Sequence, residues 1–293
     1  MSIALVSKYV DLLDEVYAME SRTAVLDGDT SLIQAGTNAH TIKVPYMTLD
    51  GLGDYSRTSG YTQGTVSVGW EEKTLSYDRG RKFSVDAMDD EETIGVAFGK
   101  LSSEFVRTKV ARELDAYRFA SYAGMVGIST VAAAALSTAQ NWMDALTAAK
   151  TTMDNDEVAE ESRYLFITPT GRNLIEAMDT TKSRATLDSF AGVITVPQAR
   201  FCTGIELQDG SSQGETKGGF LRNGNDINFM IIEKSAVMQY IKHQVNKVIT
   251  PEENQTSDSW LFFYRAYGIA EVLNMKVAGV YLHKSTVTHN ESK

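Results

Sequence analysis

Residues 75–124 limit most strongly how this chain can fold, because they join strand-like alternation, an acidic step and one very long helical pattern. Apolar and polar residues alternate over 75–77 and 83–85 with the two-residue period of a half-buried strand. Between them, Asp-Arg-Gly-Arg at 78–81 has the character of a turn, since Gly80 can adopt the positive φ that closes a hairpin. The sequence therefore predicts a charged hairpin with its turn at Gly80.

This predicted hairpin is not a self-sufficient structure. Val66, Val68 and Trp70 continue the alternation upstream, so the first arm of the hairpin is long. Two strands alone are only marginally stable in water. We therefore expect a neighbouring molecule to cover the hairpin, which indicates assembly rather than catalysis.

A long helix follows the hairpin. Residues 89–92 are Asp-Asp-Glu-Glu, and carboxylates there suit the positive partial charge of a helix N-terminus. No proline interrupts the pattern, and Gly124 offers a stop. About 30 residues at 1.5 Å rise predict a rod of roughly 45 Å, although a helix of that length would also suit the core of a large enzyme. The apolar stripe consists of Ile94, Phe98, Leu101, Phe105, Val106, Val110, Leu114 and Tyr117.

The order of these motifs carries a family resemblance. Asp-Arg-Gly at 78–80, Phe-Ser-Val-Asp at 83–86, Glu-Glu-Thr at 91–93 and Glu-Leu-Asp-Ala-Tyr-Arg-Phe at 113–119 resemble, in that order, the major capsid proteins of tailed bacteriophages. The resemblance extends through nearly the whole chain. It implies an α+β chain with the Hong Kong 97-like capsid fold, in which an extended hairpin loop reaches over an adjacent subunit.

The resemblance also implies a division of the chain. The expected parts are an N-terminal arm at 1–40, a peripheral strand and lead-in at 41–60, the extended hairpin loop at 61–88, the peripheral domain's spine helix at 89–130, the axial domain at 131–249, a peripheral loop and long strand at 250–274, and a final axial strand and tail at 275–293.

Local signals predict further elements. A helix with one apolar face begins near Ser137 or Thr138, and Thr168 followed by Pro169 begins another. Pro45 indicates that the strand containing it lies at a sheet edge, and the tail after Lys284 should fray. The apolar face after Thr138 consists of Trp142, Met143, Leu146, Ala149 and Met153, and strands are expected at 41–48, 164–167, 228–232, 240–249, 260–271 and 277–282.

Composition excludes several classes of protein. With 43% hydrophobic and 23% charged residues, the 293-residue chain can bury a real core. Its net charge of −10 and the lack of a Lys/Arg run argue against tight, sequence-independent binding of nucleic acid. Cys202 is the only cysteine, which excludes an intrachain disulfide and suits a reducing cytoplasm. Neither a secretion signal nor a membrane-spanning segment is recognisable in the sequence.

Partial catalytic and metal-binding patterns are present. Residues 210–214 match the Gly-x-Ser-x-Gly pattern of a hydrolase nucleophile elbow, and Ser212, Asp226 and His283 follow the chain order of a triad. The residues after the pattern do not begin a helix, so a surface loop is the better interpretation, and a serine hydrolase using Ser212 is kept as an alternative. The acidic residues at 154–161 lack the glycine of a calcium loop. We expect no catalytic residue, metal or cofactor.

The resemblance implies a function in assembly. The chain would form pentamers and hexamers of an icosahedral head shell that encloses double-stranded DNA without sequence-specific binding. The implied partners are further copies, a separate scaffolding protein and a portal, without a membrane; the implied location is the virion, assembled in the bacterial host cytoplasm. An encapsulin-type bacterial nanocompartment shell is the alternative with the same fold. The expected assembly contacts are Tyr9, Leu13, Tyr17, Trp70, Asp78, Arg79, Gly80, Arg81, Glu91, Glu92, Arg107, Arg112, Glu252 and Glu253.

Some members of this family join neighbouring subunits by a Lys–Asn isopeptide bond. Lys73 and Lys82 lie in the region of the extended loop, and Asn254 lies where an acceptor could stand. The reaction also needs a desolvated carboxylate to take the proton of the amine. We do not predict this bond for the present chain.

Overall fold

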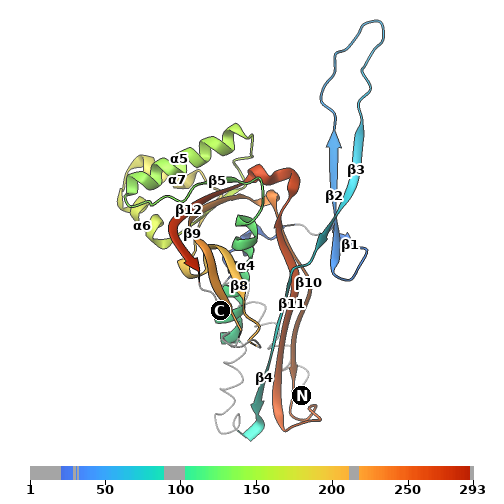
Figure 1. The fold of residues 1–293 in the computed structure, drawn as a ribbon, viewed down its shortest axis with the longest axis vertical. Helices are drawn as coiled ribbons and strands as arrows, with labels where there is room; N and C mark the ends of the chain where they lie inside the picture. Colours follow the sequence, from blue (N-terminus) through green and yellow to red (C-terminus); the bar gives the residue numbers. More distant parts are fainter. Residues whose placement is uncertain (1–20, 29–30, 32, 89–102, 211–217, 291–293) are drawn as a thin grey trace.

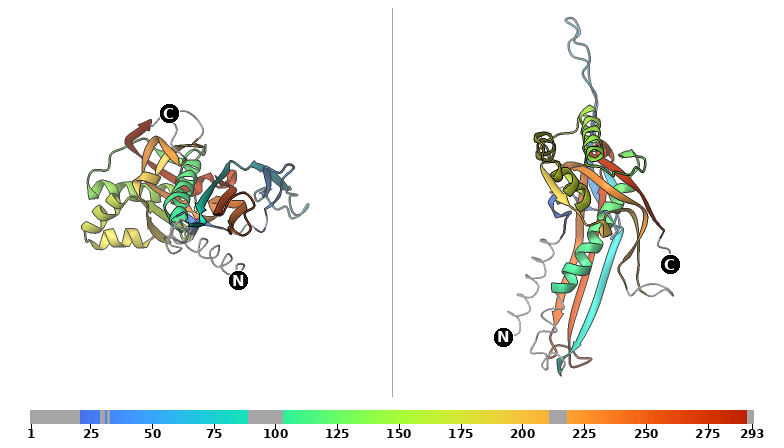
Figure 2. Two further views of the ribbon diagram at one scale, coloured as in Figure 1. Left: turned by 90° about the horizontal axis from the view of Figure 1, so that it is seen from below. Right: turned by 90° about the vertical axis from the view of Figure 1, so that its left-hand side faces the viewer.

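The computed structural model describes residues 21–28, 31, 33–88, 103–210 and 218–290. The molecule is elongated (Figure 1). A head of helices on a sheet continues into a long three-stranded sheet, and a thin hairpin projects from the opposite end. The right-hand view in Figure 2 shows the tip of the same hairpin standing clear of the body.

The head is built on a six-stranded sheet in the order β5-β12-β9-β6-β7, with β8 paired to β9. Three helices, α5, α6 and α7, lie together on the head (Figure 1). The strands are β5 (Ser129–Val131), β6 (Arg163–Ile167), β7 (Gly192–Thr195), β8 (Cys202–Leu207), β9 (Phe220–Glu233) and β12 (Val280–Asn290), and the helices are α5 (Ala139–Asn155), α6 (Pro169–Ala177) and α7 (Thr181–Asp188).

The predicted helix starts in the head are confirmed. The Thr138 side chain accepts a hydrogen bond from the backbone N–H of Asn141 at 3.2 Å, and Thr168 caps α6 in the same way, with Pro169 in the first turn. The apolar face predicted for α5 is buried against the sheet. Local capping and the helical period are therefore sufficient to specify these elements.

The long sheet has the order β10-β11-β4 and is antiparallel throughout. Its strands are β4 (Tyr77–Asp86), β10 (Val237–Ile249) and β11 (Ser259–Val272). A helix described from residue 103 passes through a π-helical turn, Val106–Val110, into α4 (Ala111–Ala123) and contacts β11. It ends at Gly124, as predicted, although Gly124 keeps a negative φ. Residues 89–102 lie outside the described residues, so the full length of the helix stays a prediction.

The predicted turn at Gly80 is wrong. β4 runs unbroken from Tyr77 to Asp86, and Gly80 pairs with Arg265 of β11. Glycine is needed here for a close approach of backbones, because a Cβ at Gly80 would lie 2.9 Å from the carbonyl oxygen of Tyr264. The segment around Gly80 is therefore folded against its own body and does not project.

The hairpin that projects is formed by β2 (Thr41–Leu49) and β3 (Val66–Thr74), which pair from Thr41↔Thr74 to Leu49↔Val66. We call residues 41–74 the projecting hairpin, and its tip is the segment 50–65. β1 (Gln34–Ala35) pairs only with Ile42 and Lys43 of β2. Pro45 therefore lies on an open edge, as predicted, and the stretch expected to lead into the hairpin is instead its tip.

The expected fraying after Lys284 is also wrong. β12 continues to Asn290, and His289 pairs with Gly224 of β9. The Asn225 amide donates to the carbonyl oxygen of Ser285 at 3.0 Å and to the hydroxyl of Thr288 at 3.1 Å. These side-chain bonds hold the tail at a bulge where the ladder is irregular. Among the residues that the structure describes, no helix is long and apolar enough to cross a membrane.

Candidate assembly surfaces

The projecting hairpin carries a large exposed apolar surface. Tyr61 at the tip is 90% exposed and Trp70 is 45% exposed. Contiguous apolar patches of this kind mark interaction sites on soluble proteins. Most of the exposed large apolar side chains in the described part of the chain belong to this hairpin: Tyr46, Met47, Leu49, Leu52, Tyr55, Tyr61, Val66, Val68 and Trp70.

Strand alternation gathers much of this surface on one face. Residues directly opposite in an antiparallel pair point to the same side. The register places Val66 opposite Leu49, Val68 opposite Met47 and Trp70 opposite Pro45, so these six residues form a continuous strip that we call the hairpin face. A two-stranded ribbon has no second layer of its own to cover such a strip.

The opposite side of the ribbon is partly covered by one of the hairpin's own side chains. Gly69 stands opposite Tyr46, and a Cβ at Gly69 would lie 2.5 Å from the Tyr46 ring. The Tyr46 ring thus occupies the space above the glycine. The hairpin face is the side left for a partner.

Two of the predicted contact residues around Gly80 are engaged within the chain. Asp78 accepts hydrogen bonds from Arg265 at 2.7 and 2.9 Å across the strand pair, and its pKa is lowered by those bonds. Arg79 Nε lies 2.7 Å from Glu113 of α4, and Arg79 Nη2 donates to the carbonyl oxygen of Gln208 at 2.8 Å. Burial lowers the pKa of Arg79, but Glu113 more than offsets this and raises it. Arg79 therefore ties β4 to α4 and the head.

Arg81 and Gly80 line a groove on the long sheet that the sequence did not predict. Its lining combines apolar and cationic side chains, and Lys82 Nζ lies 5.5 Å over the ring of Phe263. We call it the basic groove. Its lining residues are Gly80, Arg81, Lys82, His243, Val245, Lys247, Ile249, Phe263, Tyr264 and Arg265.

Glu252 and Glu253 lie at the far end of the same sheet, in the loop between β10 and β11. The loop is braced from within, because the Asn254 amide donates to the carbonyl oxygen of Ser259 at 3.0 Å. Both glutamates are exposed, together with Asp258 and Asp86. We call these four residues the acidic tip.

The remaining predicted contacts divide into two groups. Arg112 lies 5.7 Å from the Phe220 ring, and Arg107 pairs with Glu104 one turn earlier on the helix at 2.7 Å. The contacts predicted at Tyr9, Leu13, Tyr17, Glu91 and Glu92 lie outside the described residues.

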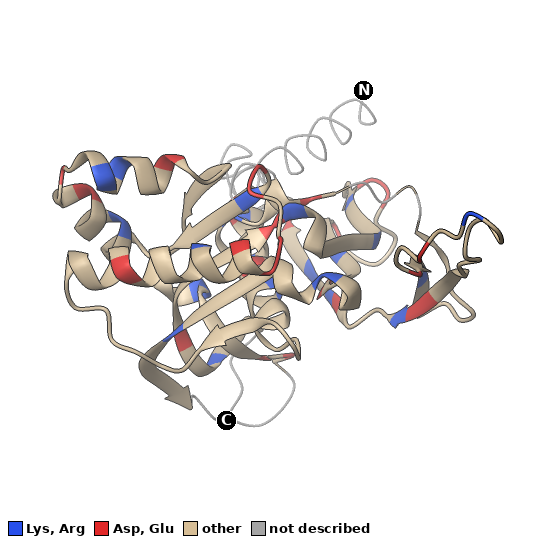
Figure 3. Ribbon diagram, turned by 90° about the horizontal axis from the view of Figure 1, so that it is seen from above, with Lys and Arg blue, Asp and Glu red and all other residues tan. Residues whose placement is uncertain are grey.

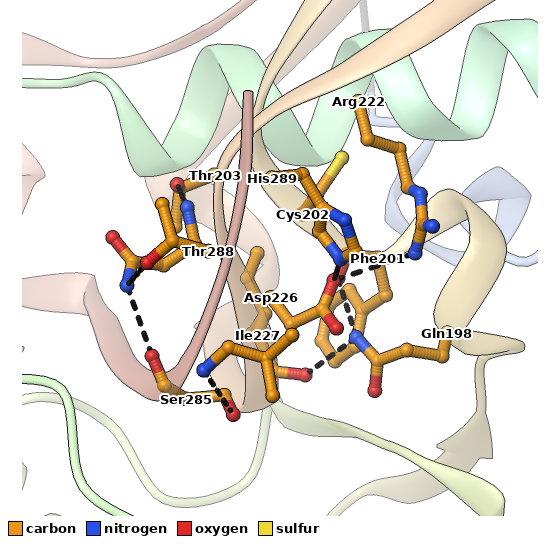
Figure 4. Close-up of polar contacts among 12 residues, drawn as sticks. Gln198, Phe201, Cys202, Thr203, Arg222, Asp226, Ile227, Ser285, Thr288 and His289 are labelled. Carbon is orange, nitrogen blue, oxygen red and sulfur yellow. Dashed lines mark hydrogen bonds and ion pairs between the residues drawn. The ribbon is translucent and has the colours of Figure 1, made fainter. Parts of the chain in front are cut away.

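The structure does not assemble the nominal hydrolase triad. Ser212 lies outside the described residues, and the histidine that meets Asp226 is His289, at 3.0 Å (Figure 4). His283 stacks on Phe229 instead, and burial lowers its pKa. In the described part of the chain, no group of three or more His, Cys, Asp or Glu residues is arranged to hold a metal ion.

No family model and no curated protein matches the chain. Solved structures do. The capsid structure of Cyanophage P-SCSP1u superposes with a TM-score of 0.51 at 13% identity, over 87% of this chain and 86% of that one. A chain of Gordonia phage Cozz superposes with a TM-score of 0.59 at 13% sequence identity, over 92% of this chain and 87% of that one. The chain has the Hong Kong 97-like capsid fold. A virus-like particle from Pyrococcus furiosus superposes with a TM-score of 0.59 at 9% sequence identity, over 94% of this chain and 98% of that one.

The Hong Kong 97-like fold and its α+β class confirm the prediction from the ordered motifs. The residue ranges assigned above to arm, peripheral domain and axial domain stay a prediction. Within the fold, the projecting element is 41–74 in this chain.

Proposed function

We propose that this chain is a major capsid protein that self-assembles into an icosahedral shell around the double-stranded DNA of a tailed bacteriophage. The observation that carries the proposal is the hairpin face, an apolar strip on a ribbon that stands clear of its own body (Figures 1 and 2). Burial of apolar surface contributes roughly 25 cal/mol per Å². A second copy of the chain would cover the strip in the shell.

In the proposed shell, the patch that one copy contributes to a contact differs from the patch on the neighbouring copy that receives it. The acidic tip complements the basic groove in charge, and the groove reaches Ile249, the last residue before the loop that carries Glu252 and Glu253. Contacts between unlike patches generate rings and closed shells only when the curvature is right. The proposal therefore includes a scaffolding protein that sets the size and a portal at one vertex, with assembly in the host cytoplasm and residence in the virion.

The charge distribution supports a container for DNA without sequence-specific binding. Lys and Arg are interspersed with Asp and Glu over the described ribbon (Figure 3), and the chain as a whole carries −10. Weak attachment would let packed DNA enter and leave. The role proposed here is structural, and no catalytic step is assigned to the chain.

A second candidate is the shell of a protein-filled nanocompartment. It is favoured by the similarity to the virus-like particle from Pyrococcus furiosus, which covers 94% of this chain. The contents of the particles distinguish the two candidates, since one shell holds DNA and the other holds protein cargo.

Electron microscopy and analytical ultracentrifugation of the chain, with and without a co-expressed candidate scaffolding protein, test the proposal. We expect large round shells. A chain that sediments only as a monomer under both conditions would refute the proposed function.

A further inference from the structure

Lys73 is buried at the base of the projecting hairpin, with 7% of its surface exposed. Lysine is almost never buried to this extent unless it is paired. The residue stands on β3 opposite Ile42 of β2, which belongs to a small apolar cluster with Leu75, Met238 and Ile269. Its side chain therefore stands where the hairpin joins the body.

The ammonium of Lys73 connects the hairpin to the long sheet. Its Nζ lies 2.9 Å from Glu71 of β3 and 3.2 Å from Glu271 of β11. Glu71 also accepts a hydrogen bond from the Asn274 amide beyond the end of β11. Burial lowers the pKa of Lys73, but the two carboxylates outweigh burial and raise it, so the side chain is charged at neutral pH.

The backbone connection at this point is short. β3 ends at Thr74 and β4 begins at Tyr77, so two residues join the projecting hairpin to the long sheet. One of them, Ser76, bonds the hydroxyl of Tyr117 on α4 at 2.6 Å. Only these two residues separate the strands along the chain, and the contact from Lys73 to Glu271 spans the connection.

We propose that Lys73 is a positioning residue that fixes the angle between the projecting hairpin and the body, and thereby the curvature at which copies close into a shell. The inference rests on the proposed function. The nine residues of β3 span about 30 Å, so a tilt of about 10° moves the far end of the strand by about 5 Å. A displacement of that size would change where the hairpin face meets a neighbouring copy.

The same geometry bears on covalent crosslinking. An isopeptide bond needs a neutral amine that reaches a second subunit. The Lys73 ammonium is charged and held inside its own chain by Glu71 and Glu271. Lys73 thus positions the hairpin and is not a crosslink donor.

The variant Lys73→Met tests the proposal, since it keeps the length of the side chain and removes the charge. We expect shells of mixed diameter by electron microscopy, and amide hydrogen exchange in β3 that is faster by about tenfold. Lys43→Met, which removes a lysine from the same hairpin opposite Glu72, should leave both measurements unchanged. The double variant Lys73→Met with Glu271→Met removes the uncompensated charge on the body side and should restore a narrower range of diameters.

Lys73→Met shells with the wild-type diameter and wild-type exchange in β3 would overturn the inference. If this variant fails to fold, Glu271→Gln decides the question with the same two measurements. A wild-type chain that forms no shells would refute the proposed function instead, and amide exchange in β3 would still decide whether Lys73 fixes the hairpin.

Discussion

The carboxylate of Asp115 accepts hydrogen bonds from both the backbone N–H and the hydroxyl of Thr23, at 3.2 and 2.7 Å. Asp115 lies on α4 and is fully buried, with Arg200 Nη1 at 3.0 Å. The Thr23 hydroxyl also accepts from buried Arg118 at 2.8 Å. Asp115 thus anchors the segment that leads from the N-terminal residues onto α4.

Replacing Asp115 with Asn should destabilise the folded chain by about 3 kcal/mol, because it removes the buried charge that pairs with Arg200 and one of the oxygens that accept from Thr23. Urea unfolding of the unassembled chain measures the change. Glu104→Gln, which removes an exposed pair with Arg107 on the same helix, should cost less than about 0.5 kcal/mol. Equal losses in the two variants would show that Asp115 is no anchor.

Polar substitution on the hairpin face should separate assembly from stability. Val68 and Trp70 are exposed, so the pair Val68→Ser and Trp70→Ser should change Tm by no more than about 2 °C, since exposed sites contribute within about 0.5 kcal/mol. Shells should be lost in ultracentrifugation. Ser67→Ala on the other side of the same strand should assemble normally. Normal shells from the double variant would contradict a role for the hairpin face.

Charge reversal tests the contact between the acidic tip and the basic groove. Glu252→Lys with Glu253→Lys should abolish shells, and adding Lys247→Glu with Lys82→Glu should restore them in part, because the same contact re-forms with opposite signs. Assembly of the wild type should also slow as salt rises. Glu160→Lys, in the loop after α5, is the matched control. Without rescue by the quadruple variant, this pairing would have to be abandoned.

Protonation of Glu233 should contribute to a loss of folding stability in acid. Burial alone would raise the pKa of Glu233, but hydrogen bonds from Ser162 and Ser235 outweigh burial, and its pKa lies below the ordinary 4.5. The contribution of Glu233 is therefore present above about pH 4.5 and is lost as the pH falls through the folded-state pKa. Urea unfolding between pH 7 and 3.5 measures this. Glu233→Gln should weaken the pH dependence of the free energy of unfolding below pH 4.5. If this dependence is unchanged in the variant, groups other than Glu233 cause the loss of stability in acid.

Elements set by local signals could be predicted from the sequence. Thr138 and Thr168 cap their helices with their own side chains, and the α5 face follows from helical period alone. The family resemblance carried by the ordered motifs was sufficient to predict the fold. Strand 41–48 and the alternation at 66–70 were also recognised, but not that they pair with each other.

The predictions were wrong where residues far away in the sequence determine the local structure. Gly80 has turn chemistry, yet Arg265, far along the chain, pairs with it and keeps β4 extended, and the carbonyl oxygen of Tyr264 lies close to it. The tail after Lys284 stays paired because Asn225 bonds it. Lys73 and Asp115 each stand among other charged residues in the sequence, and nothing local shows that carboxylates or hydroxyls from other elements meet them.

Cryo-electron microscopy of particles assembled from the full-length chain tests the central claim most directly. We predict closed shells in which Val68 and Trp70 of each projecting hairpin are buried against the body of a neighbouring copy. Particles in which the hairpin face stays in solvent, or lies back on its own chain, would contradict the account.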